Sequence, residues 1–218
     1  MEPFGVKDCA LIALATGVRA QNLRELRDGI QKVPAASLYQ HFWGRLLQPR
    51  FDEPEFNNDF AAWASHGLHD KSLAERLSVI DPSDFDDLEG LRQELVETIE
   101  IRLDESEFVP WARTDNQFHF ILSQIVVFDT RRRLKKPNEL ARRVRNLSAG
   151  SIFYHFIDAR RRPPHRVDDF SAWLMGWGDT YAELLPQLAA IDPYFASLKE
   201  LRRILADLFA LYFQEKAS

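Results

Sequence analysis

The sequence predicts a mostly α fold in which two tandem homologous helical repeats share at most a small β element in a pseudo-twofold arrangement. Three observations support this prediction. Blocks of residues recur in the same order, most segments place apolar residues at helical spacing, and each half opens with a short β-prone run. The chain has 218 residues, of which 45% are hydrophobic, which is enough for one large core or two small ones.

The repeat is visible in four pairs of segments. "SLYQHF" at 37–42 matches "SIFYHF" at 151–156, and "NDFAAW" at 58–63 matches "DDFSAW" at 168–173. A run from residue 78 matches one from residue 189, and the apolar run at 9–20 matches the run at 124–135. These pairs predict copy one at 1–108 and copy two at 109–218, joined by a linker within 104–117.

Each copy is expected to contain the same elements. A short strand comes first, at 9–17 and at 123–130, because both runs are apolar. The second run is the better candidate, since it is rich in Ile, Val and Phe. Asn22 is a predicted N-cap for the first helix, and Asn58 or Asn57 for the helix of "NDFAAW". Gly67 is expected to end that helix, and the next helix is expected to start near Ser72. A long helix closes each copy.

Charge is divided unequally between the copies. Residues 1–109 hold 11 Lys and Arg against 21 Asp and Glu, a formal charge of −10, whereas residues 110–218 hold 17 against 12, a charge of +5. An asymmetry of this kind indicates a partner surface or attraction between the halves. Cys9 is the only cysteine, and the N-terminal apolar run is too short to cross a bilayer, so a cytoplasmic protein with no membrane contact is expected.

Copy one resembles a known family along almost its whole length. The segments are "TGVRAQNLRELRDGI" at 16–30, "SLYQHF", "NNDFAAW" at 57–63 and "LAERLSVIDPSDFDDLEGLRQEL" at 73–95. They are similar to the uncharacterised bacterial family called domain of unknown function 5752, which this chain would contain in tandem copies. The resemblance implies a cytoplasmic prokaryotic protein and brings no catalytic residues with it. Copy two matches more loosely.

A second, local resemblance is to the recognition-helix region of TetR-type helix-turn-helix repressors. It rests on "VPAASLYQHF" and "LSAGSIFYHF", where a hydroxyl residue precedes an aromatic residue and His-Phe. It predicts that Tyr39, Gln40 and Arg45 project from an exposed helix to contact DNA. The motif occurs twice, however, and copy one is acidic around it, whereas DNA binding needs cations for phosphate.

A histidine and an aspartate recur in both copies and are the candidate catalytic residues. His41 and Asp59 in copy one correspond to His155 and Asp169 in copy two. A carboxylate beside an imidazole can tune a general acid or base. The structural alternative is a buried histidine that holds a helix-capping aspartate, with Trp63 filling core volume. The structural alternative predicts that His41→Ala destabilises the fold.

The sequence predicts neither a metal site nor a cofactor. His66 and His69 lie three residues apart beside Asp70, but a helix end at Gly67 would separate them, and zinc needs three or four ligands. Glycine-rich phosphate loops, nucleophile elbows and CxxC pairs do not occur in the sequence.

A cluster of basic residues in copy two is the remaining candidate binding surface. It consists of Arg131, Arg132, Arg133, Lys135, Lys136, Arg142, Arg143 and Arg145, followed by Arg160, Arg161, Arg162 and Arg166. The predicted binding residues are Tyr39, His41, Trp63, Arg131, Arg132, Arg133, Arg160, Arg161 and Arg162. The cluster predicts a protein or anionic ligand as partner, with nucleic acid less favoured, and it does not predict the oligomeric state. The leading hypothesis is therefore a non-enzymatic binding or adaptor protein. The alternatives are an enzyme that uses the His/Asp pair of copy one and a TetR-like DNA-binding regulator.

Overall fold

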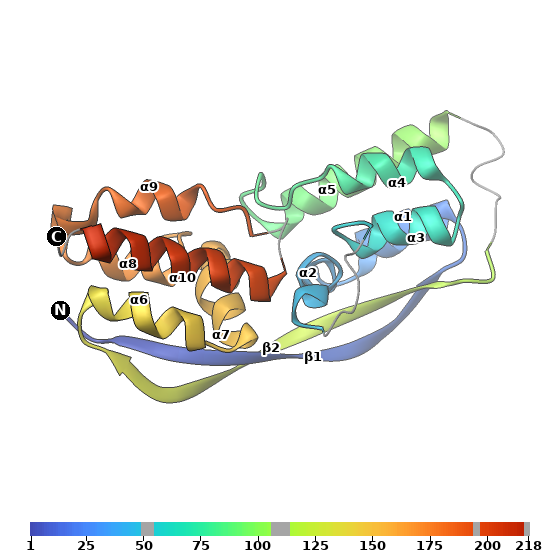
Figure 1. Cartoon of the computed structure of the whole chain (residues 1–218). Coiled ribbons are helices and arrows are strands. Elements are labelled where there is room, and N and C mark those ends of the chain that lie inside the picture. Colours follow the sequence, from blue (N-terminus) through green and yellow to red (C-terminus); the bar gives the residue numbers. More distant parts are fainter. Residues whose placement is uncertain (49–54, 106–113, 194–196, 216–218) are drawn as a thin grey trace. The chain divides into compact units, whose positions relative to one another are not determined.

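The computed structural model describes residues 1–48, 55–105, 114–193 and 197–215 of the chain. It divides into two compact units, shown in Figure 1. Unit 1 comprises Met1–Ala10 and Ile125–Ser218, and unit 2 comprises Leu11–Gln124. The first ten residues therefore pack with the second half of the chain. The expected boundary at 108/109 and most of the expected linker lie outside the described residues.

Two long strands connect the units. β1 (Phe4–Ala20) and β2 (Phe118–Leu134) each span 17 residues and form a two-stranded antiparallel sheet. β1 passes from unit 1 to unit 2 between Ala10 and Leu11, and β2 passes back between Gln124 and Ile125, so each unit holds part of each strand. Of the described residues, 57% are helical and 17% are in strands. The prediction of a mostly α fold with a small β element was therefore wrong.

The strands were underestimated because their sequence pattern changes along their length. At the start of β1, Phe4 and Val6 are buried whereas Lys7 is exposed. This alternation is expected for a strand that is covered on one face. Farther along β1, Ile12 and Leu14 are apolar yet 48% and 44% exposed. Apolar side chains that remain in solvent hide the alternation from which a strand of this length would be predicted.

Unit 2 packs its helices beside its strand halves (Figure 1). They are α1 (Leu23–Lys32), α2 (Ala35–Trp43), a 3₁₀ turn at Gly44–Leu47, α3 (Asp59–His66), α4 (Lys71–Ser78) and α5 (Leu88–Asp104). The predicted caps Asn22 and Asn58 are confirmed, because each side chain accepts a backbone N–H in the first turn. Asp70, rather than Ser72, caps α4. Helix α1 contacts α5, and α3 contacts α4.

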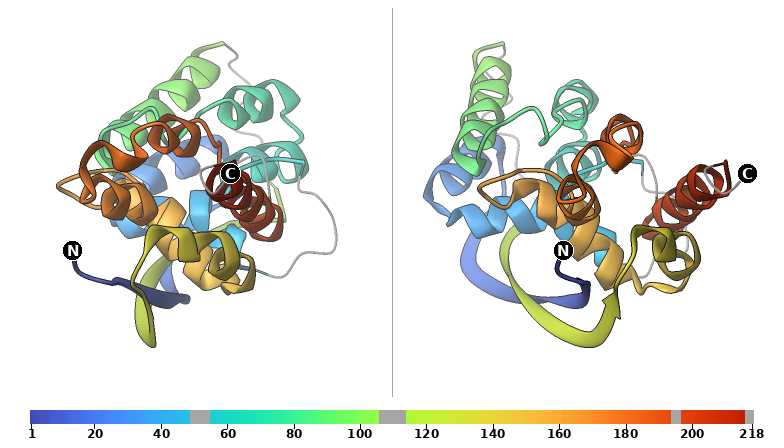
Figure 2. Two further views of the ribbon diagram at one scale, coloured as in Figure 1. Left: turned by 60° about the vertical axis from the view of Figure 1, so that its left-hand side comes forward. Right: turned by 90° about the vertical axis from the view of Figure 1, so that its left-hand side faces the viewer.

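Unit 1 has a more broken helical chain. Short turns at Pro137–Glu139 and Val144–Asn146 flank α6 (Leu140–Arg143), and α7 (Ala149–Ile152) continues into a π-helical turn at Phe153–Ile157 and a 3₁₀ turn at Asp158–Arg161. Next come α8 (Asp169–Met175), a turn at Gly178–Tyr181, α9 (Leu184–Ala189) and α10 (Leu198–Glu215). Helix α10 runs beside α6, as both views of Figure 2 show.

The far ends of the two strands bend in the same way. In β1 the hydroxyl of Thr16 donates to the Phe120 carbonyl over 2.7 Å, and in β2 the hydroxyl of Thr130 donates to the Val6 carbonyl over 2.6 Å. The next residue has a positive φ in both strands, +78° at Gly17 and +60° at Arg131. Glycine adopts this left-handed region freely, whereas an arginine there carries a cost in backbone energy.

Candidate functional site

His41 of α2 is buried in unit 2 and connects α2 to α3 and to β2 through hydrogen bonds. Its Nδ1 lies 2.9 Å from Oδ2 of Asp59, the first residue of α3, and its Nε2 lies 3.2 Å from the backbone nitrogen of Ile121 in β2. The ring is 2% exposed and packs 4.7 Å from the Phe118 ring, measured between centroids. We call this set, a histidine with its aspartate and its strand amide, a histidine joint.

The hydrogen bonds of the joint fix the form of the imidazole. A backbone N–H can only donate, so Nε2 must accept the Ile121 N–H with its lone pair. The ring proton therefore resides on Nδ1 and is donated to Asp59. Both ring nitrogens of His41 are occupied, which leaves no lone pair free to take a proton from a substrate.

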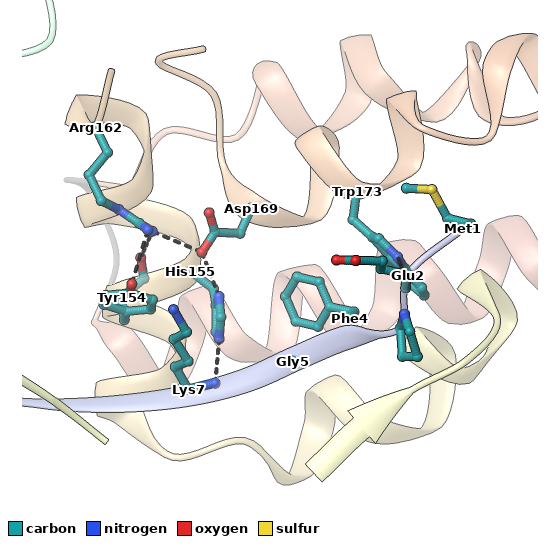
Figure 3. A pocket seen from close by; sticks show the side chains of 11 residues that line it. Met1, Glu2, Phe4, Gly5, Lys7, Tyr154, His155, Arg162, Asp169 and Trp173 are labelled. Carbon is teal, nitrogen blue, oxygen red and sulfur yellow. Dashed lines mark hydrogen bonds and ion pairs between the residues drawn. The ribbon is translucent and has the colours of Figure 1, made fainter. Parts of the chain in front are cut away.

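Unit 1 contains the same joint, which Figure 3 shows. Nδ1 of His155 lies 2.6 Å from Oδ2 of Asp169 at the start of α8, and Nε2 accepts the N–H of Lys7 in β1 over 2.8 Å. Burial acts to raise the pKa of Asp169, but hydrogen bonds from His155 and Arg162 outweigh it and hold the pKa below its ordinary value. Asp169 is therefore a stable anion.

A tryptophan accompanies each joint. The indole N–H of Trp63 donates to the Asn116 carbonyl over 2.6 Å, and that of Trp173 donates to the Glu2 carbonyl over 3.0 Å. Glu2 precedes β1 and Asn116 precedes β2, while Lys7 lies in β1 and Ile121 lies in β2. The two members of each pair are 114 residues apart. The helices of unit 2 thus anchor β2, which opens the second half of the sequence. The helices of unit 1 anchor β1, which opens the first half.

Both aspartates of the joints are also bound by an arginine. Arg45 lies 3.0 Å from Asp59, and Arg162 lies 2.8 Å from Asp169. The two arginines come from different positions, since the residue 114 positions after Arg45 is Ala159. The arginine therefore comes from a non-equivalent position in each unit, whereas the histidine, the aspartate and the strand amide occupy equivalent positions.

The helix that resembled a DNA-recognition helix does not present the expected side chains. Gln40 is 5% exposed, and Arg45 lies in the following 3₁₀ turn, paired with Asp59. Tyr39 is half-buried and stacks on Trp43 with 5.3 Å between ring centroids. These positions differ from those the TetR resemblance predicts.

The predicted basic binding residues divide into two groups. Arg160 donates to the carbonyls of Leu188 and Ile191, and Arg162 donates to Tyr154 and Asp169, so both are held by contacts inside unit 1. Arg161 between them is half-buried. Arg131, Arg132 and Arg133 are exposed on β2, and Arg133 forms two hydrogen bonds with Asp129.

The residues considered for metal binding are separated. His66 ends α3 and lies 3.3 Å from Glu55, whereas Asp70 caps α4 and bonds Arg102 over 2.8 Å. Among the described residues, no group of three or more candidate ligands is placed to hold a metal ion. Burial, followed by the charges of Asp158 and Asp8, raises the pKa of Cys9 to about 12, so its thiol is un-ionised at neutral pH.

Sequence reasoning missed three residues that line an open pocket in unit 1. The pocket measures about 500 Å³, and the missed residues are Phe4, Lys7 and Tyr154. They meet Arg162 and Trp173 there (Figure 3). The alternation of Phe4, Val6 and Lys7 could have indicated a strand, but the sequence has no local signal that this strand packs against residues about 150 positions later.

Comparison with known proteins places the chain in a family. The model of a family described as "Family of unknown function (DUF5752)" matches residues 1–210. The chain belongs to this family. The match to DUF5752 is a single one that runs through both units, and the comparisons give no support for tandem copies of the family, for a bacterial source or for a likeness to TetR-type repressors.

This DUF5752 chain is also similar to one solved structure. "The structure of OrfY from Thermoproteus tenax" superposes with a TM-score of 0.81 at 26% sequence identity. The alignment covers 95% of this chain and 94% of that one. No curated protein matches the sequence. Among the described residues, no helix has the length and apolar character needed to cross a membrane.

Proposed function

We propose that this protein is a non-enzymatic binding protein that engages an acidic protein partner through a strip of cations on unit 1. The strip consists of Arg131, Arg132, Lys135, Lys136, Arg142 and Arg143. All six residues are exposed, and they fall within 13 consecutive positions that span the end of β2, the segment after it and α6. This exposed concentration of positive charge is the observation on which the proposal rests.

Four residues of the strip act on one carboxylate, that of Glu139. Glu139 accepts the backbone N–H groups of Lys136 and Lys135 over 3.0 and 2.8 Å. These bonds, and after them the charges of Arg143 and Arg142, hold the pKa of Glu139 below its ordinary value. The single negative charge of Glu139 does not neutralise the six positive charges of the strip. The surface therefore keeps a net positive charge that a partner can bind.

Unit 2 lacks the strip although it has the same local backbone contact. Glu25 accepts the N–H of Gln21 over 2.8 Å, as Glu139 accepts that of Lys135 114 positions later. At the same offset, the six strip positions correspond to Gly17, Val18, Gln21, Asn22, Asp28 and Gly29. None of these is a cation, so the local structure does not require the positive charges. Arg131 even replaces a glycine at a left-handed position.

The charge of the whole chain favours a compact acidic partner over duplex DNA. Unit 1 holds 17 Lys and Arg against 13 Asp and Glu, a formal charge of +4, whereas unit 2 holds 11 against 20, a charge of −9. Duplex DNA is a long polyanion, and the acidic unit 2, which is covalently linked to the strip, repels it. A compact acidic surface can match the strip alone.

The histidine joints support a structural role for the predicted catalytic pair. His41 is buried, and both of its nitrogens are bonded inside unit 2, so it has no free site for proton transfer. The matched joints also support the proposal that the two units are copies of one module whose opening strands have been exchanged. A cytoplasmic location remains a prediction from the sequence.

The proposal can be tested with a charge-matched pair of triple variants. Lys135→Gln, Lys136→Asn and Arg142→Gln remove three strip charges, and the first two introduce the residues of unit 2. Lys32→Gln, Lys71→Gln and Lys199→Gln remove three exposed charges elsewhere. We expect the strip variant to bind a fluorescein-labelled ten-residue glutamate peptide about tenfold more weakly in anisotropy titrations, because each exposed charge contributes about 0.5 kcal/mol. The second variant should bind like the parent.

Two results would argue against the proposed partner class. Equal weakening in both triple variants would mean that only net charge matters. Tighter binding of a duplex DNA than of the glutamate peptide at the same salt concentration would replace the acidic protein with nucleic acid as the partner.

A further inference from the structure

The pocket of unit 1 is built on the histidine joint but is distinct from the cation strip. Its walls are the start of β1 with Glu2, Phe4 and Lys7, and four residues of the second half of the chain, Tyr154, Arg162, Asp169 and Trp173, with His155 at the base. Figure 3 shows Lys7, Tyr154 and Arg162 at one end, Trp173 and Glu2 at the other, and Phe4 between them. A volume of about 500 Å³ lies in the range of small-molecule sites.

Hydrogen-bond donors converge at the first end of the pocket. The Tyr154 hydroxyl oxygen accepts from Arg162 over 3.1 Å, so its own hydrogen is left to donate. The Lys7 ammonium lies 5.7 Å from the centre of the Tyr154 ring, and no carboxylate among the described residues forms an ion pair with it. Asp129, whose charge Lys7 does influence, is taken by Arg133.

Arg162 is held in place before any ligand arrives. Its guanidinium lies 4.2 Å from the Tyr154 ring centre and donates to the Tyr154 carbonyl and to Asp169, over 2.9 and 2.8 Å. Asp158 lies 3.2 Å from its Nε. A cation that is fixed by such contacts loses little side-chain entropy when an anion binds beside it.

Unit 2 shows which of these residues the joint itself requires. At positions 114 residues away, Lys7, Tyr154 and Arg162 correspond to Ile121, Gln40 and Gln48. The aromatic walls remain, because Phe4 corresponds to Phe118, and Trp63 makes the same contact as Trp173. Arg45 binds the aspartate of the unit 2 joint as Arg162 binds that of unit 1. Unit 2 therefore forms its joint without counterparts of Lys7 and Tyr154, and these two donors need another explanation.

We propose that this pocket binds a small organic anion, with its carboxylate or phosphate at Lys7, the Tyr154 hydroxyl and Arg162, and an apolar body along Phe4 toward Trp173. The three donors suit an acceptor-only group. Phe4 and Trp173 are 6% and 7% exposed, so each shows the pocket only a small apolar face. The Asp169 carboxylate in the pocket wall already accepts hydrogen bonds from His155 and Arg162. Together with Glu2 at the far end, it disfavours a second negative charge on the ligand.

The test uses benzoate and phenyl phosphate as probes of the full chain, with benzyl alcohol as the uncharged control. Binding is followed by isothermal titration calorimetry. We expect saturable binding of one of the two anions and none of benzyl alcohol. Lys7→Ile, which introduces the residue of unit 2, should weaken binding about tenfold or more, because it removes a charged hydrogen bond. Tyr154→Phe keeps the ring and should weaken binding less.

The controls separate this site from the fold and from the strip. Lys32→Gln removes an exposed charge in unit 2 and should leave anion binding unchanged. The triple strip variant should also bind the probe like the parent, so a failure of the strip proposal would not affect this one. The relative affinities of benzoate and phenyl phosphate identify the anionic group. The proposal is overturned if neither anion binds saturably, or if folded Lys7→Ile binds as well as the parent.

Discussion

Unit 1 and unit 2 anchor their strands through the same histidine joint, yet they surround it with different side chains. His41 and His155 each join an aspartate to a strand amide. Around them, Ile121 corresponds to Lys7, Gln40 corresponds to Tyr154, and six residues without positive charge correspond to the cation strip at the same offset. The shared part is what the fold needs. The part that differs is free to serve binding, and it is concentrated in unit 1.

The largest expected effect comes from breaking either joint. His41→Ala and His155→Ala should each lower the free energy of unfolding by about 3–5 kcal/mol, because an aspartate and a strand amide lose their partner and a buried ring is removed. Urea denaturation measures the cost. Amide hydrogen exchange should speed up at Ile121 in the first variant and at Lys7 in the second.

His119→Ala is the control for the joints, since His119 is exposed on β2 between two buried phenylalanines. It should change stability by less than about 0.5 kcal/mol. An unchanged unfolding midpoint in His41→Ala would contradict the structural role of the joint. A large cost in only one unit would show that the two joints are not equivalent.

A smaller effect should follow from exchanging packing between the units. A Cβ on Gly29 of α1 would overlap the ring of Phe120, whereas the equivalent positions in unit 1 are Arg143 and the smaller Val6. Gly29→Ala should therefore cost about 1–3 kcal/mol, despite the better helix propensity of alanine. Adding Phe120→Val should recover part of the loss and give a coupling of at least about 1 kcal/mol in a double-mutant cycle.

Gly90→Ala serves as the matched control, because a Cβ there meets only ordinary contacts with Phe85 and Asp87. It should stabilise α5 by up to about 1 kcal/mol. If Gly29→Ala were equally stabilising, the close approach of α1 to Phe120 would not limit the packing of unit 2.

The smallest effect concerns pH. Asp168 caps α8 and is 2% exposed, where unit 2 has Asn58. Burial raises the pKa of Asp168, and its hydrogen bonds with Ser171 offset only part of this. The folded state then binds this proton more tightly than the unfolded state, so the contribution to stability is present at low pH and is lost as the pH rises through the raised pKa.

Asp168→Asn removes this titration and should make the stability fall less between pH 4 and neutral pH than in the parent. Urea unfolding at a series of pH values measures the difference. Glu97→Gln, at an exposed carboxylate on α5, is the control for the loss of one acidic side chain. Parallel curves for Asp168→Asn and the parent would contradict the raised pKa.

Local chemistry made part of this structure predictable. Asn22 and Asn58 were found as helix caps because a cap and its helix are adjacent in sequence. The pairing of His41 with Asp59, and of His155 with Asp169, was proposed because both residues recur together. The cation strip was also visible, since its six residues lie within one short stretch.

Contacts between distant segments decided the rest. The sequence by itself determined the helix caps Asn22 and Asn58, the histidine–aspartate pairs and the division of charge, because these depend on neighbouring residues, on the repeat or on composition. Only the tertiary structure decided that the first ten residues pack with the second half, that the strands run for 17 residues, and that Lys7 reaches Tyr154. The physical reason is that a strand amide looks the same in every sequence, so the acceptor that it meets 80 or 148 positions away leaves no local pattern.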